Sequence, residues 1–322
     1  MKRLKMLCVV TVCLAGSAGA QTGWPSKPVR LVVPYAAGGP FDNLARALSA
    51  QLSQQWGQPV VVDNRPGGNE VIAAAAVAKA PGDGYTLLLA SDAAATLNLF
   101  VFKKLPYDPI KELAPVTRVA VANMVVAASN GLPVTDLRSL VSYAKAHPGQ
   151  VTYGSSGIGN DTHLSMAWFA KESGIEMVHV PYKGVAPAIQ DVMAGTIQLT
   201  IGAASVIGPY ALGGKVKALA IGGKHRASIL PNVPTFAEAG FPNVDASIPL
   251  VLLAPGSTPE ALRQKIYADV KKVATMPQFR SENLEKFALE PVLDSPQEFA
   301  KVLVKERALA AEKVKASGAQ LE

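Results

Sequence analysis

Two stretches of the sequence, VRLVVPYAAGGPFDNLARAL at residues 29–48 and QVTYGSSGIGNDTHLSMAWF at residues 150–169, follow one pattern. Each begins with a short apolar run that indicates a buried strand, continues through a loop of small residues and enters an amphipathic helix. Small residues let a ligand approach the loop backbone, and the helix start supplies unpaired N–H groups and a partial positive charge. One such loop in each half of the chain predicts that a small anion is held between two lobes.

Strand and helix patterns alternate through most of the chain, which predicts an α/β fold with largely parallel sheets. We expect a first lobe at residues 21–123, to which residues 250–322 return, and a second lobe at residues 124–249. The strand at 123–129, which begins the second set, is also expected to cross between the lobes. Strands are predicted at 29–33, 59–63, 85–90, 123–129, 151–154, 177–180, 197–201 and 216–221.

Several helix ends are marked by residues with known capping preferences. Thr135 is predicted to cap a helix that ends before His147-Pro148-Gly149. Gly195 is placed to end the helix that begins near Ala186. Ser295-Pro296-Gln297-Glu298 has the spacing of a capping box, with proline in the first helical turn.

The N-terminus has the pattern of a cleavable signal peptide over residues 1–20. Lys2, Arg3 and Lys5 precede an apolar run that is too short to span a membrane, and Ala18-Gly19-Ala20 fits a cleavage site. We therefore expect export to the periplasm. Both cysteines of the chain lie inside this segment, so the mature protein is predicted to have no disulfide and no thiolate metal site.

The distribution of charged residues indicates which kinds of partner the protein binds. The formal net charge is +7, of which the signal peptide carries three, and this leaves +4 on the mature chain. Its lysines and arginines are scattered, which predicts no nucleic-acid partner and a mild attraction for anionic solutes. The four histidines show no metal-ligand spacing, and no dinucleotide or phosphate-binding fingerprint is complete, so no metal or other cofactor is predicted.

Catalytic motifs are incomplete. Gly154-Ser155-Ser156-Gly157-Ile158 lacks the final glycine of a nucleophile elbow. Asp161 and His163 belong to one helix start, whereas the members of a triad converge from separate elements. Helix capping and packing explain these residues better, so we predict a protein that is not an enzyme. An exported serine hydrolase that uses Ser155 or Ser156 with His163 is the alternative.

The chain resembles the tripartite tricarboxylate transporter receptors, also called Bug or TctC-type solute-binding proteins. The resemblance extends over nearly the whole mature chain. It is carried by WPSKPVRLVVPYAAGGPFDNLAR, GQPVVVDNRPGG, APGDGYTLLLAS, KLPYDPIKELAPVTRVA, HVPYKGVAPAIQDVMAGTIQL, GKVKALAIGGKHRASILPNVPTFAEAGFP and LLAPGSTPE.

The resemblance implies a type II-like Venus-flytrap fold and a small carboxylate bound in the cleft between the lobes. It also implies delivery to a large and a small membrane permease subunit, and we expect the receptor to be a monomer. A receptor that presents its loaded form to a signalling partner is a further alternative. Carried over by position, the ligand-binding residues would be Tyr35, Ala37, Gly38, Gly39, Ser91, Ser155, Ser156, Gly159, Asn160, Thr162, Lys183 and Ser205.

Some of these residues have a second interpretation. Lys183 would offset ligand charge or be a solvated loop lysine, and the two are weighed evenly. Asp42, inside the first loop, is interpreted as an acidic partner of the helix start rather than as a ligand contact.

The sequence departs from the family pattern at three places. Gly68-Asn69-Glu70-Val71 replaces a Gly-rich run, Thr200-Ile201-Gly202 replaces an aromatic and polar group, and Pro249 replaces a frequent tryptophan. We therefore expect a cleft that is less polar and less aromatic than is usual in the family.

Overall fold

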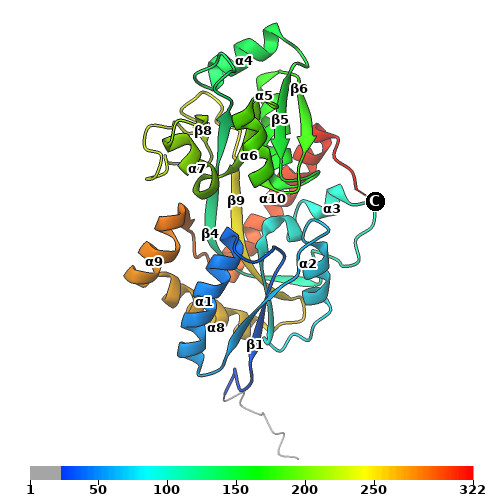
Figure 1. The fold of residues 1–322 in the computed structure, drawn as a ribbon. Helices are drawn as coiled ribbons and strands as arrows, with labels where there is room; N and C mark the ends of the chain where they lie inside the picture. Colours follow the sequence, from blue (N-terminus) through cyan, green and yellow to red (C-terminus); the bar gives the residue numbers. More distant parts are fainter. Residues whose placement is uncertain (1–22, 322) are drawn as a thin grey trace, which may run out of the picture.

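One long pair of antiparallel strands connects two α/β lobes in the computed structural model, which describes residues 23–321 (Figure 1). Strand β4 (Leu113–Ala128) pairs with β9 (Ser247–Pro255) from Leu113 as far as Asn123. From Met124 onward, β4 pairs instead with β7 (Leu199–Ala203) and β8 (Lys217–Ile221). The same strand therefore lies in the sheets of both lobes.

The first lobe is built on three parallel strands, β1 (Val29–Val33), β2 (Val60–Asn64) and β3 (Thr86–Ser91), in the order β2-β1-β3-β9-β4. A short strand β10 (Leu289–Pro291) pairs with the other edge of β4. Buried side chains of α1 (Pro40–Trp56), α8 (Glu260–Ala274) and α9 (Pro277–Asn283) share one core cluster with these strands. Helix α2 (Val71–Ala78) contributes to a second cluster, and η1 (Asp92–Ala95), α3 (Asn98–Val101) and η2 (Glu285–Phe287) lie in the connections.

The second lobe repeats this plan. Strand β5 (Val151–Ser155) is parallel to both β6 (Met177–Pro181) and β7. Buried residues of α4 (Leu137–Ala146) and α5 (Asp161–Ser173) form one core cluster, and those of α6 (Val185–Ala194) and α7 (Ala204–Leu212) form another. Each sheet therefore carries two separate apolar clusters, as expected for an α/β lobe.

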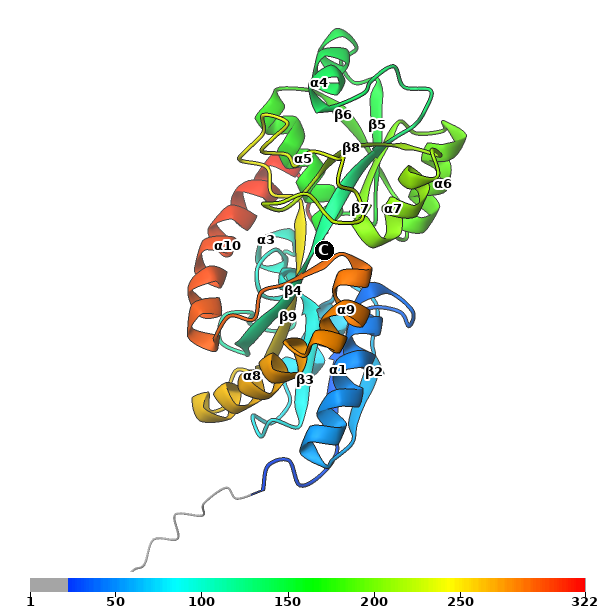
Figure 2. The same cartoon turned by 90° about the vertical axis from the view of Figure 1, so that its left-hand side faces the viewer.

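The last helix, α10 (Pro296–Ser317), contacts both lobes (Figure 2). Phe299 and Leu303 near its start are buried in a first-lobe cluster. Ala310 and Val314 near its end share a cluster with Leu164 of α5. The sequence predicts that residues 250–322 return to the first lobe, and the structure adds this second contact.

The prediction of a two-lobed α/β fold is confirmed, with two local corrections. Strand β4 is 16 residues long, so it begins well before the predicted 123–129. The sheets are mixed rather than largely parallel, because β4, β8, β9 and β10 pair in antiparallel fashion. Residue-by-residue patterns indicate a strand but not its partner, which is why the direction of pairing was missed.

Helix caps follow the sequence closely. Ser295 and Glu298 form the predicted capping box, and Gly195 ends α6 in the left-handed region at φ 80°. The cap of α4 is Asp136 and not Thr135, since the Asp136 carboxylate accepts from the Ser139 N–H at 2.8 Å.

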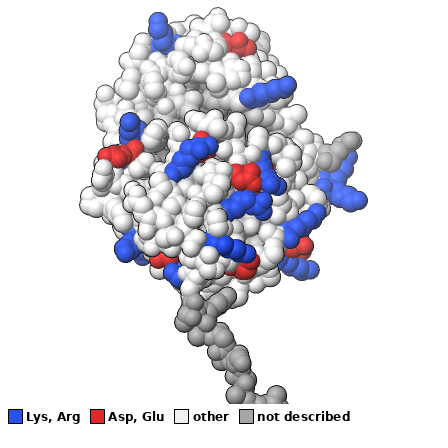
Figure 3. All heavy atoms as spheres, turned by 60° about the horizontal axis from the view of Figure 1, so that its bottom comes forward, with Lys and Arg blue, Asp and Glu red and all other residues white. Residues whose placement is uncertain are grey.

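The predicted signal peptide lies outside the described residues, and the predicted lobe boundaries remain a prediction. Among residues 23–321, none of the helices has both the length and the apolar character that a membrane crossing requires. Basic and acidic side chains are interspersed on the face of the molecule shown in Figure 3, without one continuous basic patch.

Candidate functional site

A cleft of about 1120 Å³ lies between the two lobes. Its walls are the loops that follow β1, β2 and β3 in the first lobe and β5 and β6 in the second. These loops stand at the carboxyl ends of parallel strands, where open α/β sheets bind their ligands. The lining residues are Pro34, Tyr35, Ala36, Phe41, Pro66, Gly67, Gly68, Asn69, Glu70, Ser91, Phe102, Ser156, Gly157, Ile158, Asn160, Asp161, Thr162, Pro181, Tyr182, Lys183, Gly184, Ile248 and Leu321.

The first small-residue loop is organised around Asp42. Its buried carboxylate accepts hydrogen bonds from the Gly38 N–H at 2.8 Å, Arg46 Nε at 2.8 Å and Asn64 Nδ2 at 2.9 Å. The hydrogen bond from Arg46 is the main reason that the pKa of Asp42 falls to about 2. The chain thus supplies its own anion to this loop, and Asp42 is a structural residue rather than a cleft residue.

A hydrogen-bond network holds the second small-residue loop in place. Thr162 Oγ1 accepts from the Ser156 N–H at 2.8 Å and donates to Asn160 Oδ1 at 2.7 Å. Asn160 caps α5 by accepting from the His163 N–H at 3.1 Å, and its Nδ2 donates to Ser156 Oγ at 2.9 Å. These bonds fix the side chains of Ser156, Asn160 and Thr162 at the wall of the cleft.

An acidic residue lies in the first-lobe wall. Glu70 is buried, and its Oε1 accepts from the Tyr35 hydroxyl and from the Ser91 N–H at 3.2 Å. Its Oε2 has no hydrogen-bond partner among the described residues. Burial is the main reason that the pKa of Glu70 rises to about 8.

The two lobes touch beside the cleft. Asn69 Nδ2 donates to the Gly159 carbonyl of the second lobe at 3.3 Å. Gly159 has φ 74°, and a Cβ placed there would come within 2.5 Å of Val101 Cγ1. Glycine at position 159 therefore allows the two lobes to approach each other closely.

Half of the residues predicted to bind the ligand line the cleft. These are Tyr35, Ser91, Ser156, Asn160, Thr162 and Lys183. The other six, which do not line it, are Ala37, Gly38, Gly39, Ser155, Gly159 and Ser205. Ser155 is fully buried, and the Ser205 hydroxyl is buried without a partner among the described residues.

The serines and histidines are not arranged for catalysis. Ser155 Oγ lies 2.6 Å from His179 Nε2, and not beside His163, whose Nδ1 accepts from the Gly159 N–H at 3.1 Å. The two imidazoles stack with centroids 3.8 Å apart. Burial lowers the pKa of each to about 4, so both are neutral at pH 7. No carboxylate of the described residues hydrogen-bonds to either ring.

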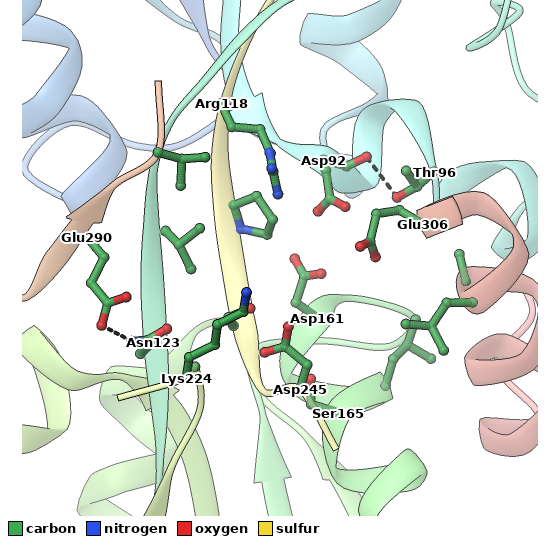
Figure 4. Close-up of a pocket in the computed structure, with 18 of the residues that line it drawn as sticks. Asp92, Thr96, Arg118, Asn123, Asp161, Ser165, Lys224, Asp245, Glu290 and Glu306 are labelled. Atoms are coloured by element: carbon green, nitrogen blue, oxygen red, sulfur yellow. Dashed lines mark hydrogen bonds between the residues drawn. The ribbon is translucent and has the colours of Figure 1, made fainter. Parts of the chain in front are cut away.

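A second cavity of about 320 Å³ lies beside β4 and β9 (Figure 4). Figure 4 shows the carboxyl groups of Asp92, Asp161 and Glu306 on one side of it, and Arg118, which is paired with Asp294 at 2.7 Å, on another. Asp161 also lines the cleft. The basic side chains of Lys224 and Lys313 line the same cavity, so its walls carry charges of both signs. No group of acidic or histidine side chains within residues 23–321 is arranged to hold a metal ion.

A two-lobed fold with a solvent-accessible cleft between strand-end loops defines a class, the solute-binding receptors. The family model of the tripartite tricarboxylate transporter family receptor matches residues 44–318. The chain belongs to this family, which consists of solute-binding receptors and not of enzymes.

Related proteins match over most of their length. A UPF0065 protein from the gbd 5′ region of Cupriavidus necator is 34% identical, over 93% of this chain and 88% of that protein. An R. palustris structure solved with adipate is 34% identical with a TM-score of 0.83, and covers 92% of this chain and 100% of its own. MatC from Rhodopseudomonas palustris with bound malate is 28% identical with a TM-score of 0.78, and the match covers 90% of this chain and 100% of that chain.

Several residues of the cleft have no ligand-binding role predicted from the sequence. Glu70 and Asp161 had no predicted role at the ligand, although the replacement of the Gly-rich run by Gly68-Asn69-Glu70-Val71 was the available signal for Glu70. Leu321 is also part of the wall, because its backbone pairs with Val101 and Lys103. Nothing local in the sequence indicates that pairing.

Proposed function

We propose that this receptor captures a small carboxylate solute in the interlobe cleft and delivers it to the large and small permease subunits of a tripartite transporter. The observation that carries the proposal is the composition of the second wall. There, Ser156, Asn160 and Thr162 are held by a hydrogen-bond network at the start of α5. Hydroxyl and N–H groups at a helix start suit an anion.

The comparisons support the chemical class. The two R. palustris relatives were solved with adipate and with malate, and both of these ligands are dicarboxylates. Lys183 lines the same cleft from the loop after β6 and would add a positive charge. We therefore propose a dicarboxylate as the first class of solute to test.

The N-terminal sequence supports the location. We propose that residues 1–20 direct export and are removed, so that the mature receptor works in the periplasm. Mass spectrometry of a periplasmic fraction is expected to find a chain that begins near Gln21. A chain retained at full length would contradict this part of the proposal.

A thermal-shift screen tests ligand binding. The purified mature protein is mixed with mono-, di- and tricarboxylates, aromatic acids and acidic amino acids. A ligand that binds the folded state raises the melting temperature by mass action. We expect a shift with at least one aliphatic dicarboxylate that increases with its concentration. The absence of any shift with all carboxylates, followed by no heat in calorimetry, would overturn the proposal.

A further inference from the structure

The backbone beside Glu70 is strained. Asn69 and Glu70 have φ values of 49° and 73°, in the left-handed region that favours glycine. Both residues line the cleft, and asparagine tolerates this region better than glutamate does, so the strain lies mainly at Glu70. Non-glycine residues held in this region cluster at functional sites. The strain is a reason to look for a function of the Glu70 side chain.

The hydrogen bonds of Glu70 distinguish its two oxygens. Oε1 accepts from the Tyr35 hydroxyl and from the Ser91 N–H, while Oε2 has no partner among residues 23–321. When Glu70 is protonated, the oxygen that already accepts two donors is its carbonyl oxygen. The proton of a neutral Glu70 therefore belongs on Oε2, which is then a donor.

The surroundings of Glu70 favour this neutral form. Glu70 forms no ion pair within the described part of the chain. The ionisable groups that affect the pKa of Glu70 are Tyr35 from the loop after β1 and Asp161 from α5. The charge of Glu70 in turn raises the pKa of Asp92 and Tyr107. The positive charge of Lys313 acts to lower the pKa of Asp161 and Asp92, and Lys183 lies in the second-lobe wall. Burial is the largest cause of the raised pKa of Glu70, and it outweighs the hydrogen bonds from Tyr35 and Ser91, which lower that pKa.

We propose that Glu70 is a specificity-determining residue that stays protonated in the loaded receptor and donates a hydrogen bond from Oε2 to a carboxylate oxygen of the solute. The inference rests on the proposed function, since it requires a carboxylate in the cleft. A neutral carboxyl group recognises an anion without the repulsion that an ionised one would add. Binding is then linked to the proton that Glu70 holds.

Calorimetry with adipate and malate as probes tests the inference. Both probes are fully ionised between pH 7 and pH 9, so their own titration does not contribute. With a Glu70 pKa of about 8, affinity for the parent protein is expected to fall about tenfold from pH 7 to pH 9. Buffers of different ionisation enthalpy are expected to show proton uptake on binding at pH 8.5.

Three variants separate a ligand contact from a structural role. Glu70→Gln keeps an acceptor for Tyr35 and Ser91 and a donor in place of Oε2, so it is expected to bind like the parent at pH 7 without the loss at pH 9. Glu70→Gly suits the positive φ but removes the donor, and is expected to bind roughly ten- to a hundredfold more weakly at pH 7. Tyr35→Phe removes a hydrogen bond that favours ionised Glu70, which moves the loss of affinity to higher pH.

The outcomes are distinct. Parent affinity that is constant from pH 7 to pH 9, or Glu70→Gly binding as tightly as the parent, overturns the inference. Proton release on binding, with affinity lost in Glu70→Gln, also overturns it and shows an ionised Glu70 that accepts from the solute. If the parent binds no carboxylate at all, the proposed function fails and the inference fails with it.

Discussion

Two neighbouring serines show how strongly position decides the role of a residue. Ser155 is the last residue of β5, where it is fully buried and its hydroxyl donates to the Gly157 carbonyl at 2.9 Å. Ser156 is the first residue of the loop and lines the cleft. The strand buries Ser155 and the loop brings Ser156 to the cleft, so a motif that contains both serines does not assign both to the ligand.

Placing a carboxylate at Ser156 is expected to weaken solute binding strongly. In Ser156→Glu the new charge would repel an anionic solute and compete for the donors of the second loop. The loss of about two hydrogen bonds to a charged group weakens adipate binding by roughly 30-fold or more. Calorimetry measures the loss, with Ser281→Glu, an exposed serine on α9, as the matched control. Unchanged affinity in a folded Ser156→Glu protein would remove the second loop from the site.

The stacked histidines are expected to make the protein less stable in acid. The pKa of both His163 and His179 is about 4 in the folded protein, against about 6.5 in an unfolded chain. The unfolded state therefore binds more protons, so this stability is complete above pH 6.5 and is lost as the pH falls to 4. Urea unfolding of the parent is expected to show a steeper decline over this range than that of His179→Gln. An equal decline in the stability of the parent and of His179→Gln would contradict the role of the stacked histidines.

Helix α10 is an element whose start could be predicted from the sequence and whose contact with the second lobe could not. The Ser295 hydroxyl accepts from the Glu298 N–H at 3.3 Å, and Glu298 Oε2 accepts from the Ser295 N–H at 2.9 Å. These four residues are enough to predict the cap from the sequence. The contact of the distal half with α5 depends on where the two lobes place their surfaces.

Removing the cap of α10 is expected to lower stability without changing the site. Ser295→Ala deletes the hydroxyl that satisfies a backbone N–H group, and such a change costs about 1 kcal/mol. Thermal unfolding is expected to show a lower melting temperature, while adipate affinity stays the same because Ser295 does not line the cleft. Ser281→Ala provides a surface serine control. Equal melting temperatures would show that the capping box contributes little to stability.

At the scale of the whole molecule, the connections between the lobes are where we expect a hinge motion. Strands β4 and β9 run between the lobes, and α10 contacts both of them. The hydrogen bond from Asn69 to the Gly159 carbonyl, on the opposite lobe, is a contact that opening would break. A solute that touches both walls adds contacts in the closed arrangement and shifts the population toward it.

Ligand binding is therefore expected to make the molecule more compact. Small-angle scattering with saturating adipate is expected to give a smaller radius of gyration than scattering without it. Asn69→Ala removes one contact between the lobes and is expected to weaken affinity while leaving the fold intact. An unchanged radius of gyration at saturation, with binding shown by calorimetry, would contradict closure.

The sequence by itself determined the α/β class, most strand and helix positions, the two small-residue loops and the family. These features depend on local periodicity, caps and motifs, which a single chain displays directly. Only the tertiary structure decided that β4 begins at Leu113 and pairs in the sheets of both lobes, that Ser155 and Gly159 stay outside the cleft, and that Glu70 enters its wall. Those outcomes depend on pairing and burial between residues far apart in the chain. The Glu70 oxygen without a partner arises in the same way, because Tyr35 and Ser91 reach it from separate loops.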